Sequence, residues 1–347
     1  MQRNKLKIEV QSEIGRLNAV LLHRPGAEVE NMTPRNVQRA LYSDILNLSI
    51  ARNEYEQLSG VLSKLAAVYE VRVLLVNVLE QWKPRADLVH RICVSEDVVP
   101  YIDTLMEMDS PELARVLIEG LPARVDSLTA YLRNEYYALY PLYNFYFTRD
   151  AAVTIGNQAL ICRMANKVRM RESLIMDAIY RYSGAFECSV VDANAGEQDS
   201  SEIIMEGGDI IIAREDILIV GNGVRTTPQG IDFIVDRLCR CNPEARMNVI
   251  VQQLPSQPES FIHLDMVFTL LDKDKCMIFK PLIMRANQYQ TVHIVIEGGK
   301  VSSIRPVAGL LPALRSLGMD LKPLVCGGDD DWDQEREQWH SGANFFA

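Results

Sequence analysis

The sequence predicts an α/β protein that carries a helical segment between two α/β parts. Three observations favour this fold class. The first 80 residues read as strand, helix and strand; residues 81–140 show helical periodicity with little strand-like alternation; and short strands alternate with helices in the rest of the chain. We therefore expect a first α/β part over residues 1–80, a helical insertion over 81–140 and the remainder of the α/β fold over 141–347.

The first part is interpreted from two apolar runs and the helix between them. Residues 20–22 predict a short strand, which Pro25 and Gly26 end. From Tyr55 to Tyr69 apolar residues recur at the spacing of a helix with one buried face. The apolar run VRVLLV over residues 71–76 then predicts a buried strand.

The other predicted elements are interpreted in the same way. In the helical insertion, Ser110 reads as a cap followed by Pro111 at the first helical position, and Gly120 suits the end of that helix. Further on, a helix is expected over 171–182 and another after Thr227-Pro228. Strands are expected at residues 159–162, 210–212, 217–220, 249–251, 266–271, 277–279 and 293–296.

Composition and charge exclude several classes of protein. The chain has 347 residues, of which 48% are hydrophobic and 24% charged, and its formal net charge is −10 without basic runs. We therefore expect no binding to nucleic acid or to anionic membrane. No apolar run has the length of a signal-peptide core or a membrane span, and the seven cysteines are scattered without a C-x-x-C pair. These features favour a cytoplasmic protein with reduced thiols.

A weak repeat consists of three Gly-Gly pairs beside predicted strands. They follow Glu206, Glu297 and Cys326. Repeated units of this kind occur in propeller-like folds, but Gly-Gly is also a common turn at a strand end. Spacing alone favours the simple turn.

Polar side chains that could carry chemistry cluster next to the apolar strands. Two carboxylates, such as Asp150 and Asp265, match the planar fork of a guanidinium group, and two arginines could bind a substrate carboxylate in the same way. A histidine supported by a glutamate is a general acid/base pair. If His263-Leu264-Asp265 is a strand, His263 and Asp265 lie on one face. The candidate residues are Asn144, Asp150, Arg169, Glu206, Arg225, His263 and Asp265.

Each of these residues also has a simpler interpretation. An aspartate at a strand end is usually a turn or cap residue, Arg149 and Asp150 could form an ion pair, and an isolated H-x-D is more often structural than catalytic. A metal site is not expected, because none of the five histidines lies within four residues of another. Both interpretations remain open at the level of single residues.

Taken together, the motifs resemble those of bacterial arginine deiminases. They are LHRPG from residue 22, NFYFTRD from 144, EGGD from 206, RT from 225, IHLDMVFT from 262, CGGD from 326 and EREQWHSGAN from 335. The resemblance runs from end to end in the order expected for the family. It implies a five-bladed α/β propeller of the pentein type with a helical insertion, and it suggests a homo-oligomer.

The resemblance also implies roles for the candidate residues. Asp150 and Asp265 are similar to the carboxylates that bind the substrate guanidinium, and His263 to the general acid/base, with Glu206 beside it. Arg169 and Arg225, helped by Asn144, are similar to the residues that bind the α-carboxylate of L-arginine. The implied reaction forms L-citrulline and ammonia through a covalent cysteine intermediate, without a metal or an organic cofactor.

One feature departs from the family pattern. The nucleophilic cysteine of the family lies close to the C-terminus, and none of the seven cysteines matches its position; Cys326 belongs instead to the CGGD motif. We expect that the nucleophile lies beyond Ala347, that the last blade is incomplete at this residue, and that residues 1–347 alone are inactive. The alternatives are a related amidinotransferase or dimethylarginine hydrolase, or a protein of the same fold that binds arginine without turning it over.

Overall fold

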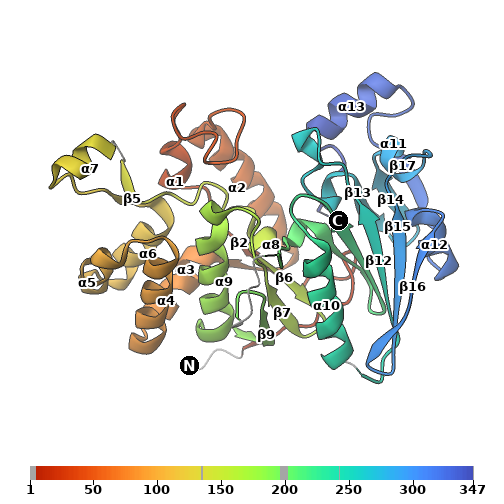
Figure 1. Ribbon diagram of the computed structural model, residues 1–347, viewed down its shortest axis with the longest axis horizontal. Helices are drawn as coiled ribbons and strands as arrows, with labels where there is room; N and C mark the ends of the chain where they lie inside the picture. Colours follow the sequence, from red (N-terminus) through yellow and green to blue (C-terminus); the bar gives the residue numbers. More distant parts are fainter. Residues whose placement is uncertain (1–4, 134–135, 196–201, 242, 347) are drawn as a thin grey trace. The chain divides into compact units, whose positions relative to one another are not determined.

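The computed structural model describes residues 5–133, 136–195, 202–241 and 243–346, and helices and strands alternate along most of this length (Figure 1). The mixed content confirms the predicted α/β class. The chain forms two compact units: the first comprises Met1–Ile8, Leu17–Ala152 and Asn166–Val190, and the second comprises Glu9–Arg16, Val153–Ala165 and Val191–Ala347. No helix within the described residues is both long and apolar enough to span a bilayer.

The first unit begins with a strand, a helix and a strand, as the sequence predicts, but the second strand lies at other residues than predicted. The helix ends at Leu65 rather than reaching Tyr69, and of its predicted buried face Leu62 is buried while Leu58 and Leu65 are exposed. Strand β2 (Ala19–Leu22) pairs in parallel with β3 (Ala67–Glu70), and helix α2 (Leu48–Leu65) connects them after the short α1 (Ala27–Glu30). Asn47 caps α2, because its side chain accepts a hydrogen bond from the N–H of Ile50.

The strand predicted over residues 71–76 is wrong. These residues begin helix α3 (Val71–Leu79), and the strand β3 lies just before them. The buried positions of α3 are 71, 74, 75, 78 and 79, which is the i, i+3, i+4, i+7 stripe of a helix. The run VRVLLV by itself reads as a buried strand. The helical spacing becomes clear only when Val78 and Leu79, which follow the run, are included.

Helices dominate residues 82–133. They are α4 (Trp82–Ser95), the 3₁₀ turn η1 (Val99–Tyr101), α5 (Ile102–Glu107), α6 (Ser110–Glu119) and α7 (Leu128–Arg133). Two short antiparallel strands flank α7: β4 (Leu121–Pro122) before it and β5 (Tyr137–Leu139) after it. Asp109, not Ser110, caps α6, since its side chain accepts from the N–H of Glu112 at 2.8 Å. Gly120 ends α6 with φ 96°, as its position predicts. The interpretation of residues 81–140 as an insertion stays a prediction.

The remaining elements of the first unit include the two that carry Asp150 and Arg169. The remaining elements are β1 (Leu6–Lys7), which pairs in parallel with β8 (Phe186–Glu187), the short α8 (Thr148–Ala151), the 3₁₀ turn η2 (Lys167–Arg169) and α9 (Met170–Tyr182). Helix α9 matches the predicted helix at 171–182, and it packs against α3 and α4.

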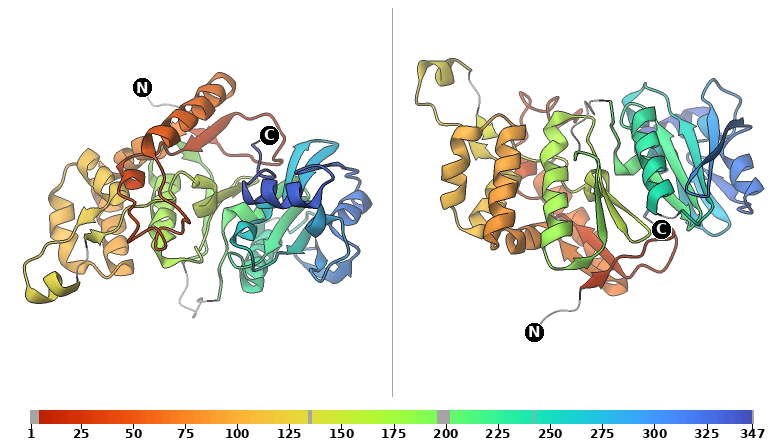
Figure 2. Two further views of the ribbon diagram at one scale, coloured as in Figure 1. Left: turned by 90° about the horizontal axis from the view of Figure 1, so that it is seen from above. Right: turned by 60° about the horizontal axis from the view of Figure 1, so that its bottom comes forward.

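The second unit is built around a five-stranded sheet. Its strand order is β10 (Ile210–Arg214), β11 (Ile217–Asn222), β12 (Met247–Gln253), β15 (Thr291–Glu297) and β16 (Lys300–Val307), and only β11 and β12 run parallel. Helices α10 (Pro228–Cys241) and α12 (Leu310–Ser316) lie on opposite faces of this sheet (Figures 1 and 2).

Two three-stranded sheets complete the β structure. One contains β13 (Phe268–Asp272), β14 (Lys275–Ile278) and β17 (Lys322–Val325), and the other contains β6 (Ala152–Ile155), β7 (Gln158–Ile161) and β9 (Ser189–Asp192). Three 3₁₀ turns, η3 (Gly207–Asp209), η4 (Glu259–Phe261) and η5 (Leu264–Met266), and the helix α11 (Lys280–Ile283) lie between the strands, and α13 (Asp331–Trp339) follows β17. The five-bladed arrangement stays a prediction.

The three Gly-Gly pairs are not equivalent in the structure. Gly298 and Gly299 have φ of 60° and 68°, and Gly327 and Gly328 have φ of 77° and 73°, so both pairs are left-handed turns that favour glycine. Gly207 and Gly208 instead open the turn η3. The interpretation as a turn at a strand end therefore holds for Gly298-Gly299 and Gly327-Gly328. Gly207-Gly208 has no positive φ that would require glycine.

Candidate active site

The candidate residues of the first unit gather around the Arg169 guanidinium, at the start of α9. Its Nη1 lies 2.8 Å from Oδ2 of Asp150, and its Nε and Nη2 donate to the Glu172 carboxylate at 3.1 and 2.8 Å. All three side chains are buried. The arginine is thus held between two carboxylates, which compensates the cost of burying its charge.

Glu172 is a member of this cluster that the sequence reasoning missed. It follows Arg169 by three residues, a spacing at which side chains on a helix meet. The helix predicted at 171–182, extended by one turn, would have been the signal. Tyr42 lies nearby and hydrogen-bonds Tyr146; burial first, and then the charge of Tyr146, raise the pKa of Tyr42.

The segment that carries Asn144 and Asp150 is fixed from both ends. The Asn144 amide donates to the carbonyl of Ala40 at 2.8 Å, and the hydroxyl of Thr148 donates to the carbonyl of Leu21 at 3.0 Å. The ring of His23 packs on Phe145 with centroids 5.1 Å apart. Leu21 in β2 and His23 directly after it therefore contact the segment that carries Asn144 and Asp150.

The candidate residues of the second unit gather around Glu206, whose side chain is fully buried. Its Oε2 lies 2.9 Å from Nε2 of His263, and its Oε1 accepts from the N–H of Ala165 at 3.0 Å. Nη1 of Arg225 lies 3.2 Å from Oε1. A backbone N–H, a guanidinium and an imidazole therefore offset the cost of burying the charge of Glu206.

His263 and Asp265 come together, but not as the sequence analysis expected. They do not lie on a strand: His263 is extended and Asp265 lies in the turn η5. A Cβ placed on Gly208 would lie 2.5 Å from Nδ1 of His263 and 3.1 Å from Oδ2 of Asp265. Both side chains thus approach the bare backbone of Gly208, and this close approach is why position 208 requires glycine.

The two candidate arginines share one feature. Arg169 is bound by Asp150 and Glu172, and Arg225 is bound by Glu206. The sequence predicts that these arginines hold a substrate carboxylate. In the structure each of them lies against a carboxylate of the protein.

The cysteines whose pKa is shifted are poor nucleophiles. Burial raises the pKa of Cys93 to about 11 and that of Cys276 to about 12. Burial, and then a nearby acidic side chain, also raises the pKa of Cys239 and Cys326. Since the thiolate is the reactive form, these four thiols are not activated.

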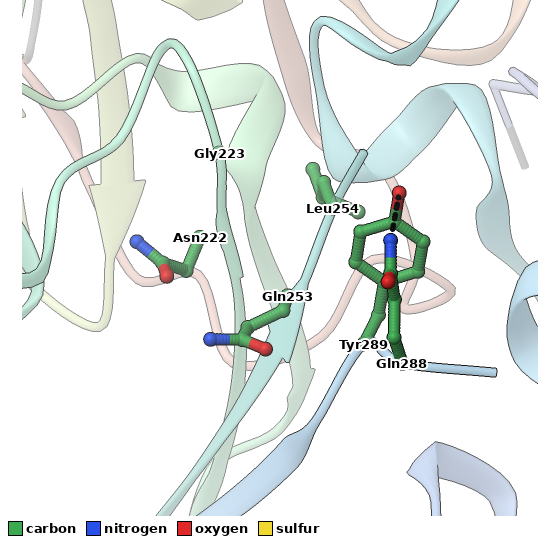
Figure 3. A pocket seen from close by; sticks show the side chains of 6 residues that line it. All are labelled: Asn222, Gly223, Gln253, Leu254, Gln288 and Tyr289. Carbon is green, nitrogen blue, oxygen red and sulfur yellow. Dashed lines mark hydrogen bonds between the residues drawn. The ribbon is translucent and has the colours of Figure 1, made fainter. Parts of the chain in front are cut away.

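A hollow of about 390 Å³ opens in the second unit next to the loop that carries Arg225. Figure 3 shows the amides of Asn222 and Gln253 on one side of it, with Tyr289 and Gln288 on the other. The carbonyl of Thr226 accepts from the N–H of Gly223 and from the amide of Asn222. No charged side chain lines the hollow, so it does not provide the predicted chemistry.

Comparison with the sequences of known proteins identifies a family. A sequence model described as arginine deiminase matches residues 38–347. An arginine deiminase of Bacillus cereus (strain ATCC 10987) is 32% identical, with 99% of this chain and 87% of that protein covered. One of Listeria monocytogenes serotype 4b (strain CLIP80459) is 29% identical, with 98% and 85% covered. Among solved structures, an inosamine-phosphate amidinotransferase from Streptomyces griseus is 10% identical, with 92% of this chain and 75% of that chain covered and a TM-score of 0.45. The chain belongs to the arginine deiminase family.

Proposed function

We propose that this protein hydrolyses L-arginine to L-citrulline and ammonia. The observation that carries the proposal is the buried pair of His263 and Glu206, 2.9 Å apart, with Asp265 and Arg225 close by in the same unit. A histidine held by a carboxylate is suited to proton transfer. The curated relatives named arginine deiminase, from Bacillus cereus and Listeria monocytogenes, support the choice of substrate.

In this proposal two carboxylates bind the guanidinium of the substrate. Asp150 already binds a guanidinium in the structure, that of Arg169 at 2.8 Å, so its oxygens suit this partner. Asp265 supplies the second carboxylate, beside His263. Because both charges are partly or fully buried, their pairing with a planar cation is strong and directional.

Two arginines bind the opposite end of the substrate. Arg169 keeps Glu172 as a partner when Asp150 turns to the substrate, and Arg225 keeps Glu206. Each can then direct a remaining N–H to the α-carboxylate, with Asn144 beside Arg169. Arginine binding in this account is an exchange of ion-pair partners rather than the filling of a preformed apolar pocket.

The chemical steps need a nucleophile and a proton carrier. A cysteine thiolate attacks the guanidinium carbon, His263 gives a proton to the leaving nitrogen, and ammonia departs. Water, deprotonated by His263, then attacks the same carbon; the C–S bond breaks and citrulline is released. One water is consumed for each arginine, and no metal or organic cofactor takes part in the proposed steps.

We propose that the nucleophile is a cysteine that follows Ala347. Raised pKa values at Cys93, Cys239, Cys276 and Cys326 support this, since none of these thiols is activated. We also propose the five-bladed α/β arrangement of the family for the whole protein.

The test is a citrulline assay on residues 1–347 and on the protein as its gene encodes it. The proposal predicts arginine-dependent citrulline and ammonia from the gene-encoded protein and background from residues 1–347. Turnover that requires an added amine acceptor would instead show an amidinotransferase. Arginine binding without turnover by either protein would show a binding protein, and no binding would contradict the assigned substrate.

A further inference from the structure

Asp209 is a fully buried carboxyl group that the proposed chemistry does not use. It ends the turn η3, three residues after Glu206. Its Oδ1 accepts from the N–H of Leu264 at 2.9 Å, and its Oδ2 accepts from the hydroxyl of Thr226 at 2.6 Å. Both oxygens therefore receive a hydrogen bond from a different segment of the chain.

Each of these bonds is made next to a candidate site residue. Leu264 lies between His263 and Asp265, and Thr226 follows Arg225. The hydroxyl oxygen of Thr226 also lies 3.3 Å from the N–H of Glu206, from which it accepts. One carboxylate thus connects the three segments that carry the second-unit cluster.

Two glycines leave the space that this arrangement needs. A Cβ on Gly221, in β11, would lie 2.3 Å from Oδ1 of Asp209. A Cβ on Gly208 would lie 2.5 Å from Nδ1 of His263. The Asp209 carboxylate and the imidazole are therefore both packed against bare backbone, which fixes where each can lie.

We propose that Asp209 is a positioning residue that holds the His263 segment and the Arg225 segment at Glu206 for catalysis. The proposal rests on the proposed function, because the residues it positions are those assigned to arginine hydrolysis. Asp209 itself does not contact the substrate in this account. It acts through the backbone of Leu264 and the side chain of Thr226.

The ionisation of Asp209 supports the geometric argument. Both of its partners are donors, so an ionised carboxylate, which only accepts, satisfies both of them. Burial raises the pKa of Asp209 to about 7, although the nearby His263 lowers it. A pKa raised above the ordinary 3.8 means that the carboxyl favours folding at low pH and that this contribution is lost as the pH rises through 7. At pH 8 the ionised group carries a cost of burial that a neutral isostere lacks, although asparagine leaves one of the two donors unpaired.

The test compares Asp209→Asn and Asp209→Ala with wild type at pH 8, all three as the gene-encoded protein. Alanine leaves Leu264 and Thr226 without an acceptor and should lower kcat by about 10²-fold, the effect of a displacement of about 1 Å in an active site. Asparagine keeps one acceptor oxygen and should lose less. In the asparagine variant, removal of the buried charge offsets the donor that is left unpaired, so its melting temperature should fall less than that of Asp209→Ala while its kcat is lower than that of wild type.

The matched control is Asp177→Asn. Asp177 is a buried carboxylate in the first unit that pairs with Arg91 and Arg181, away from the second-unit cluster in sequence and contacts. This variant should lower the melting temperature without changing kcat. If the Asp209 variants lose activity only in proportion to their loss of folded protein, or keep wild-type kcat, the positioning role is wrong.

A second readout separates this proposal from the proposed function. In protein labelled with ¹⁵N-histidine, Asp209→Ala should change the ring signals of His263, whereas Asp177→Asn should leave them in place. If wild type forms no citrulline, the proposed function is wrong. The His263 ring signals then test by themselves whether Asp209 positions His263. Unchanged His263 signals in Asp209→Ala would then overturn the positioning role.

Discussion

Nε2 of His263 lies 2.9 Å from Oε2 of Glu206, and both side chains are buried. Glu206 also accepts from the backbone of Ala165 and from Arg225, so it cannot turn away without leaving these donors. The imidazole is thus oriented by a carboxylate that is itself held in place. This relationship is the basis of the proton-transfer role, and the predictions below test it together with the residues around it.

The carboxylates assigned to the guanidinium should control arginine affinity. Asp150→Asn and Asp265→Asn should each weaken binding by about 2–5 kcal/mol, because each leaves part of a desolvated cation unpaired. Calorimetric titration with arginine measures this. Asp236→Asn is the control, since Asp236 lies on the exposed face of α10 and pairs only with Arg240 among the described residues. Equal affinity in all four proteins would remove both residues from the guanidinium site.

Arg225 should recognise the carboxylate of the substrate and not its guanidinium. Arg225→Gln should weaken arginine binding by about 1.5–3 kcal/mol, the usual contribution of a hydrogen bond to a charged group. Agmatine, which is arginine without the carboxylate, should bind the variant and the wild type alike. A matching loss for both ligands would show that the variant disturbs Glu206 and His263 instead.

The buried pair of His23 and Glu28 should stabilise the first unit in a pH-dependent way. Burial by itself would raise the pKa of Glu28, but the hydrogen bond and charge of His23 and the N–H of Gly26 lower it below the ordinary 4.5. A lowered pKa stabilises the fold above 4.5, and this contribution is lost as the pH falls through the lower, folded-state value.

Glu28→Gln should therefore reduce the free energy of unfolding by about 3–5 kcal/mol at pH 7, as expected for breaking a buried pair. The difference from wild type should shrink as the pH falls below 4.5. Denaturant unfolding at several pH values measures both effects. Glu30→Gln, an exposed position in the same short helix, is the control. A difference that grows with acid would contradict the assigned pair.

Cys326 should be dispensable for catalysis although it lies in the CGGD motif. It is buried, with its sulfur 3.0 Å from the position of a Cβ on Gly342, and burial raises its pKa. Cys326→Ser in the gene-encoded protein should keep citrulline formation at near the wild-type rate. Loss of activity in a variant that is folded by circular dichroism would make Cys326 the nucleophile.

The elements that the sequence predicted correctly have local signals. The apolar stripe of α10, the paired strands β10 and β11 and the glycine that ends α6 depend on residues close together in the chain. The exposed strand β16 was missed, since nearly all of its side chains face solvent and no apolar alternation marks it.

The contacts within the site could be predicted only in part. The resemblance pointed to His263 and Glu206, which the structure brings together across 57 positions of sequence. It did not predict that Asp265 lies in a turn, where the N–H of the preceding Leu264 donates to Asp209, a residue 55 positions away in sequence. Nor did it predict the pairing of Arg169 with Asp150 and Glu172, which requires η2 and α8 to meet in the fold.

The most direct test of the account is citrulline formation by the gene-encoded protein with and without His263. The account predicts that His263→Ala lowers the rate by about 10²–10⁴-fold, the usual contribution of a proton-transfer residue, while arginine affinity changes little. An unchanged rate in the His263→Ala variant would contradict it.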